Sequence, residues 1–187
     1  MTTTTRPQVW IFVDWDETIT AHDTLHLIAA PDSNEVEAPP PFFFFTDYYI
    51  KLLAEHEKEF GPRDTLERQL EYLDSLTAVE NASVRNVEKH GLFKGVTNND
   101  LFNRGKQVRF RDGWEEFTSH IKQSPNARII AVISVNWSAV FIEGALKRIH
   151  DDNFIRQFEI RANVLVIIIG ADRRTLRWTR TEREQGT

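Results

Sequence analysis

Short apolar runs and stretches of helical spacing alternate along this chain. Residues 9–13 (V-W-I-F-V) and 128–133 (R-I-I-A-V-I) are almost entirely apolar and rich in β-branched residues. Strands of a parallel sheet, buried on both faces, have this composition. Residues 158–160 and 164–169 are further strand material, and residues 137–149 predict a helix. Strands that alternate with helices predict an α/β fold with a Rossmann-like parallel sheet.

A long helical block separates the first two predicted strands. A Pro-rich segment that ends in four consecutive Phe, residues 31–45, predicts a loop. Apolar residues then recur at intervals of three and four, which predicts separate helices over residues 49–60, 66–76 and 79–90. The whole block, residues 21–111, is too long for a simple crossover. It predicts a helical subdomain inserted at the carboxyl end of the first strand, the edge where ligands bind in open α/β sheets.

The predicted domain boundaries follow from this order of elements. Residues 1–20 and 112–170 form the α/β core, and residues 21–111 form the helical insertion. The apolar pattern ends at Gly170. The remaining residues, 171–187, carry five Arg and predict an irregular basic tail.

The composition excludes several classes of protein. Asp and Glu number 28 against 23 Lys and Arg, a net charge of −5, whereas proteins that bind duplex DNA through its phosphates are basic. Nucleic acid is therefore not expected as a partner. The absence of cysteine excludes disulfides, Cys-ligated zinc and iron–sulfur clusters. No apolar run reaches the roughly 20 residues of a membrane helix, and no secretory signal is visible, so a cytoplasmic protein without a membrane partner is expected.

Two carboxylates directly follow the first predicted strand. Asp14 and Asp16 leave the sheet together, with Trp15 between them and Thr18 four residues after Asp14. One carboxylate can attack an electrophile while the other passes a proton to the leaving group. Their hard oxygens also suit Mg²⁺. The alternative is an acidic turn of surface carboxylates. In either case Trp15, between the two aspartates, is expected to pack behind the loop.

The segment V-D-W-D-E-T-I-T resembles the first motif of the haloacid dehalogenase-like (HAD) phosphatases, an apolar strand followed by D-x-D-x-T. The apolar run ending at Ser134 resembles their second motif, a strand that ends in Ser or Thr. The helical block has the chain position of the family's C1-type cap. The layout is most similar to the phosphoserine-phosphatase-like branch, which carries an acidic cap residue where this chain has Asp23.

The resemblance implies a role for each matching residue. Asp14 would be the nucleophile and a Mg²⁺ ligand, and Asp16 the general acid and base, with its backbone carbonyl on the metal. Thr18 would brace the loop, and Ser134 would bind the transferring phosphoryl group. Asp23 would contact the substrate. Two alternatives stay open, because Ser134 and Asp23 could each cap a helix instead.

Two further motifs of the family are not found. The family requires a Lys or Arg beside the nucleophile and an acidic pair that completes the metal site. The chain is therefore expected to be a truncated member whose core sheet is incomplete. Candidates for these two motifs are Asp172 for the acidic one and Arg173, Arg174 or Arg177 for the cation, whereas Lys147 lies mid-helix and is expected to face solvent.

The resemblance implies Mg²⁺-dependent hydrolysis of a small phosphomonoester through an aspartyl-phosphate, with a small phosphorylated metabolite as the partner. Truncation would impair this activity, and an open sheet edge would favour self-association. The alternative is a non-catalytic HAD remnant that acts by binding a ligand or another protein. The sequence leaves the identity of the substrate open.

Overall fold

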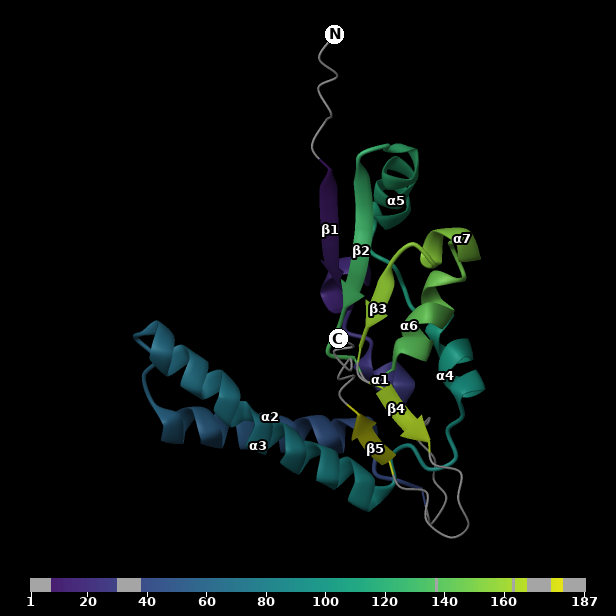
Figure 1. Ribbon diagram of the computed structural model, residues 1–187. Helices are drawn as coiled ribbons and strands as arrows, with labels where there is room; N and C mark the ends of the chain where they lie inside the picture. Colours follow the sequence, from purple (N-terminus) through teal and green to yellow (C-terminus); the bar gives the residue numbers. More distant parts are fainter. Residues whose placement is uncertain (1–7, 30–37, 137, 163, 168–175, 180–187) are drawn as a thin grey trace, which may run out of the picture. The chain divides into compact units, whose positions relative to one another are not determined.

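The computed structural model describes residues 8–29, 38–136, 138–162, 164–167 and 176–179. The chain divides into two compact units (Figure 1). One unit combines Met1–Ile28 with Val96–Thr187, and the other is Ala29–Gly95. The second unit starts later and ends earlier in the sequence than the predicted insertion of residues 21–111.

A parallel sheet forms the centre of the first unit. Its strands are β1 (Val9–Asp14), β2 (Ala127–Ile133) and β3 (Glu159–Arg161), in the order β1-β2-β3 (Figure 1). Asp14 pairs with Ile133, and Ile133 pairs with Arg161, so the three carboxyl ends meet at one edge. The predicted α/β class with a parallel sheet is confirmed.

The two strands predicted as buried differ in their surroundings. In β2, Ile129, Ala131 and Val132 are buried, as expected for a central strand. In β1, Trp10 and Phe12 leave 66% and 56% of their surfaces exposed. The prediction of a strand buried on both faces therefore holds for β2 but is wrong for β1. Side chains alternate between the two faces of a strand, and one face of β1 is exposed among the described residues.

Five helices accompany this sheet in the described part of the first unit: α1 (Leu25–Ile28), α4 (Asn98–Gly105), α5 (Trp114–Gln123), α6 (Ala139–Leu146) and α7 (Asp152–Ile155). Side-chain caps start three of them. Thr97 caps α4, Ser138 caps α6 and Asp151 caps α7. Each cap oxygen accepts a backbone N–H that has no partner within its helix.

Helix α4 packs against α6 within the first unit, although the sequence analysis assigned it to the insertion. Leu101 of α4 and Phe141, Ile142 and Leu146 of α6 are completely buried. The chain therefore returns to the first unit before α4 begins. The contacts of α4 with α6, and not its position in the sequence, assign α4 to this unit.

The second unit is a hairpin of two long helices, α2 (Phe42–Phe60) and α3 (Leu66–His90) (Figure 1). Contacts between His56 and Ser75 near one end, and between Phe44 and His90 near the other, show that the helices are antiparallel. Gly61 and Gly91 end α2 and α3 with positive φ angles, the conformation that glycine adopts most easily.

Two predictions in this unit are wrong. Residues 42–45 begin α2 instead of ending a loop, and only Phe45 of the four Phe is buried. Residues 66–76 and 79–90 form one helix instead of two, because Thr77 and Ala78 between them do not interrupt a helix.

A separate antiparallel pair consists of β4 (Val164–Ile167) and β5 (Leu176–Thr179). β4 agrees with the predicted strand, whereas β5 lies in the tail that was expected to be irregular. The alternation of Leu176, Arg177, Trp178 and Thr179 is typical of a strand, and the Arg-rich composition obscured it. Among the described residues, no helix has both the length and the apolar character needed to cross a bilayer.

Candidate active site

The candidate site begins where β1 ends. Asp14 is the last residue of β1, and the chain then enters a tight turn, η1 (Trp15–Ile19). Within this turn Glu17 has a φ of 58°, in the left-handed region that costs a non-glycine residue about 1–2 kcal/mol. The backbone N–H of Glu17 donates to Thr20 Oγ1 at 3.0 Å, and the Arg111 guanidinium donates to the Glu17 carbonyl oxygen. These contacts stabilise the conformation.

Asp14 and Thr18 form a pair at the surface of this turn. Thr18 Oγ1 donates to Asp14 Oδ2 at 3.1 Å, and both residues are exposed. This bond fixes one carboxylate oxygen, while Oδ1 has no hydrogen bond among those described. Asp14 is therefore an oriented carboxylate that an external reactant can reach.

Asp16 has a different environment, although it is only two residues away. It is half-buried, and its Oδ1 accepts the backbone N–H of Thr24 at 2.8 Å and Thr24 Oγ1–H at 2.6 Å. Burial raises the pKa of the Asp16 carboxyl, and the two bonds from Thr24 act in the opposite direction. The charge of Asp23 adds to the increase, and the nearby Asn136 amide adds to the decrease. Two neighbouring carboxylates in unlike environments are typical of a nucleophile paired with a general acid.

Trp15 is completely buried behind the turn, as predicted. Its indole Nε1–H donates to Thr24 Oγ1 at 3.0 Å, and its ring contacts the edge of Phe110 at 6.2 Å between centroids. An antiparallel bridge between Thr20 and Phe110 lies next to this contact. The turn is thus anchored to the segment between α4 and α5.

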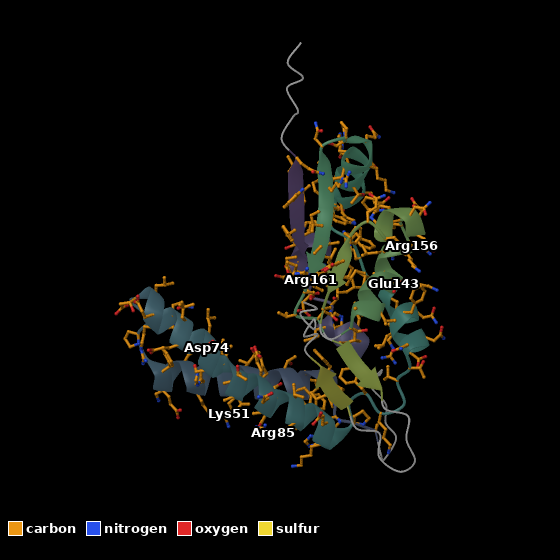
Figure 2. The ribbon with its side chains drawn as sticks, in the orientation of Figure 1. Lys51, Asp74, Arg85, Glu143, Arg156 and Arg161 are labelled. Carbon is orange, nitrogen blue, oxygen red and sulfur yellow. The ribbon has the colours of Figure 1, made fainter. Side chains whose placement is uncertain are left out.

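Ser134 follows the last residue of β2, beside Asp14 on the neighbouring strand. Its backbone N–H donates to the Arg161 carbonyl oxygen at 2.8 Å, at the end of β3 (Figure 2). Ser134 Oγ accepts the N–H of Asn136 at 2.9 Å. The cap of α6 is Ser138, so the alternative that Ser134 caps this helix is wrong.

Asp23 is exposed and accepts the N–H of Leu25 at 2.9 Å, at the start of α1. This bond spans two residues and forms a turn before α1, so it is not the capping bond of the alternative role, which would reach the second or third residue of the helix. The substrate contact expected for Asp23 remains a prediction.

Two residues of the site were missed by the sequence analysis. Thr24 is 3% exposed and Asn136 is completely buried, and Asn136 Nδ2 donates to Thr24 Oγ1 at 3.2 Å. Asn136 lies just after β2, and a polar residue near a strand end was the available signal for it, whereas nothing in the local sequence marked Thr24. Their contact joins positions 112 residues apart, so no local pattern could have paired them.

The donor chemistry at Asp14 suits a hard cation, which takes one or two carboxylates together with waters and phosphate oxygens. The side chain of Asp16 is held by Thr24, which leaves its backbone carbonyl as the donor that the sequence analysis expected. No group of three or more His, Asp or Glu side chains gathers around a common point within the described ranges. The residues present therefore fit part of a Mg²⁺ site.

The candidate residues for the two motifs that were not found contribute no described side chain to the site. Asp172, Arg173 and Arg174, and the side chain of Arg177, lie outside what the structure describes. Lys147 forms ion pairs with Glu143 at 2.9 Å and with Asp152 at 3.3 Å. Lys147 is therefore bound within its own helix face and to the start of α7.

Comparisons with known proteins show what this chain is similar to in sequence and in structure. No family model matches the chain. The CTO1 family protein C17G9.12c of Schizosaccharomyces pombe is 33% identical over 138 residues, which cover 72% of this chain and 48% of that protein. The chain thus spans about half the length of this relative. A solved phosphoserine phosphatase, described as a phospho-aspartyl intermediate analogue, gives a TM-score of 0.46 at 14% identity, over 88% of this chain and 60% of the other.

Proposed function

We propose that this chain carries the nucleophile half of a HAD-type phosphatase site, which hydrolyses a small phosphomonoester through an aspartyl-phosphate. One observation carries the proposal. The exposed Asp14 is oriented by Thr18, whereas Asp16, two residues away, is half-buried and held by Thr24. Such a division between two carboxylates suits covalent attack by one and proton transfer by the other.

The residues would act in two steps. Asp14 Oδ1 attacks phosphorus, the bond from phosphorus to the ester oxygen breaks, and Asp16 donates a proton to the departing alkoxide. In the second step Asp16 takes a proton from water, the resulting hydroxide attacks phosphorus, and Asp14 leaves as the carboxylate. Ser134 would hydrogen-bond the phosphoryl oxygens at the adjacent strand end.

Asp14 and the Asp16 carbonyl would hold Mg²⁺. When bound, this ion offsets the charge of the phosphate facing Asp14. The helical unit Ala29–Gly95, inserted between β1 and β2 in the chain, is proposed as the cap that determines specificity, with Asp23 as a substrate contact. A cytoplasmic location and a small phosphorylated metabolite as substrate complete the proposal.

Hydrolysis of 4-nitrophenyl phosphate by the purified chain, with and without Mg²⁺, tests this function. Asp14→Asn should reduce metal-dependent turnover by at least ~1,000-fold, because the attacking carboxylate is lost. Glu116→Gln, at an exposed position of α5 that is part of neither the candidate site nor the proposed cap, is the matched control and should retain full activity. A folded wild-type chain without turnover would favour the non-catalytic binding protein, and equal activity in Asp14→Asn would exclude the assigned nucleophile.

A further inference from the structure

The hydroxyl of Thr24 lies within hydrogen-bond distance of three side chains around Asp16. Their chemistry determines to which of the three the hydroxyl donates its proton. Thr24 Oγ1 lies 2.6 Å from Asp16 Oδ1, 3.0 Å from Trp15 Nε1 and 3.2 Å from Asn136 Nδ2. A hydroxyl has one proton to donate and two lone pairs that accept. Three partners therefore use its whole capacity.

Two of the three partners can only donate. An indole Nε1–H has no lone pair to offer, and neither has an amide Nδ2. The orientation of the Asn136 amide is itself fixed, because Asn136 Oδ1 accepts the backbone N–H of Ser138 at 3.2 Å. Both donors point at the Thr24 oxygen, so the single Thr24 proton must point at Asp16 Oδ1.

This direction determines which oxygen of Asp16 is free. Oδ1 accepts two hydrogen bonds, from the Thr24 backbone N–H at 2.8 Å and from its hydroxyl at 2.6 Å. Both of its lone pairs are then occupied, and a proton on Oδ1 would break one bond. Among the described residues no hydrogen bond to Oδ2 is found, so Oδ2 is the oxygen left to exchange a proton with a reactant.

We propose that Thr24 is the positioning residue of the site, and that with Trp15 and Asn136 it holds Asp16 so that proton transfer takes place on Oδ2. This inference rests on the proposed function for its chemistry, but the geometric part stands on the contacts alone. All three supporting side chains are at most 3% exposed, so they are protected from competition with water.

The first test compares two leaving groups. Thr24→Val keeps the shape but removes the hydroxyl, and should lower kcat/KM for an alkyl phosphate by ~10-fold or more, because an alkoxide must be protonated as it leaves. For 4-nitrophenyl phosphate, whose leaving group departs unprotonated, kcat/KM should fall less than ~3-fold. The comparison uses kcat/KM because it ends at the departure of the leaving group, whereas kcat includes the second step, which both substrates share. Thr24→Ser should restore kcat/KM for the alkyl phosphate.

The matched control is Thr118→Val, a buried threonine of the same unit whose hydroxyl donates to helix carbonyl oxygens of α5. This control variant should leave kcat/KM unchanged for both substrates. Equal losses for both leaving groups in Thr24→Val, or no loss for either, would overturn the positioning role. If Thr24→Val fails to fold, Trp15→Phe removes one of the two donors that orient the hydroxyl, and should give a smaller loss with the same dependence on the leaving group.

A second readout does not need activity. Three-bond NMR couplings of Asp16 should report one χ1 rotamer in the wild type, in Thr24→Ser and in Thr118→Val, and rotamer averaging in Thr24→Val. A single unchanged rotamer in Thr24→Val contradicts the inference even if the chain is active. If the wild type hydrolyses neither substrate, the proposed function fails, and this measurement alone decides whether Thr24 positions Asp16.

Discussion

Gly105 of α4 and Gly144 of α6 bring the backbones of their helices into direct contact. A Cβ added at Gly105 would overlap the carbonyl oxygen of Phe141, and one added at Gly144 would overlap that of Phe102. Backbone atoms cannot move aside as a flexible side chain can. The two glycines therefore determine how closely α4 approaches α6.

Gly105→Ala and Gly144→Ala are each expected to lower the free energy of unfolding by at least ~2 kcal/mol, because overpacking a close contact costs about 1–3 kcal/mol or more. This loss outweighs the gain of about 1 kcal/mol that Ala brings to a helix interior. Urea denaturation of the whole chain measures it. Asn99→Ala, an exposed position of α4, is the control and should change stability by less than ~0.5 kcal/mol. Stability equal to the wild type in both glycine variants would refute the close contact.

Thr18→Val should reduce the proposed hydrolysis without unfolding the chain. The change removes the donor to Asp14 Oδ2 and keeps the shape of the side chain. A misplaced nucleophile should lower kcat by roughly 10- to 100-fold. Because both residues are exposed, the free energy of unfolding should change by less than ~0.5 kcal/mol. Thr18→Ser keeps the hydroxyl and should keep the rate, and a Thr18→Val variant as fast as the wild type would show that Asp14 needs no brace.

The stability of the chain should fall as the pH is lowered below neutral, because of His150. Its ring is buried against Trp114 and Phe154, and its Nε2 has no hydrogen-bond partner among the described residues. Burial lowers the pKa of His150 to about 4, the Lys122 charge adds to this decrease, and Asp151 opposes it. In the unfolded chain the pKa is about 6.5.

The unfolded chain therefore binds this proton more tightly than the folded one. The stability is fully present above pH ~6.5 and is lost as the pH falls towards 4, by on the order of 2 kcal/mol. Denaturation at pH 7 and at pH 4.5 measures the difference. His150→Leu should remove most of this pH dependence, whereas His120→Gln, at an exposed position of α5, should preserve it. An equal pH dependence in His150→Leu would assign the effect to other groups.

Thr97→Ala should destabilise α4 through the loss of its capping box. Thr97 Oγ1 accepts the Asp100 N–H at 3.1 Å, and Asp100 Oδ2 accepts the Thr97 N–H at 2.8 Å. Loss of such a cap costs about 1 kcal/mol. Thermal unfolding compares Thr97→Ala with Thr97→Ser, which should retain most of the stability. If both variants lose the same amount, the hydroxyl is not the source of the effect.

Local pattern was sufficient to predict the elements that carry Asp14, Asp16 and Ser134. Each lies at or just after the end of an apolar strand, and in a parallel sheet those ends meet at one edge. The helical structure of residues 49–60 and of most of residues 66–90 was also predicted correctly, because the apolar residues of an amphipathic helix recur three and four positions apart.

Features that depend on distant contacts could not be predicted from the sequence. Thr24 and Asn136 meet only because β1 and β2 pair, and neither residue belongs to a recognisable motif. The placement of α4 depends on the backbone contact at Gly105 and Gly144, which sequence spacing does not reveal. The exposure of Trp10 and Phe12 depends on what packs on β1, and not on the composition of β1 itself.

The pairing of Val9 with Ala127 has a consequence for the order in which the chain acquires its structure. Every residue of α2 and α3 lies between these two partners, so the sheet can form only after a very long loop has closed. Loop closure of this kind is slow, whereas helices and a helical hairpin need only local contacts. The α2–α3 hairpin should therefore form early in folding. The candidate site, which needs β1 beside β2, should be among the last parts of the chain to assemble.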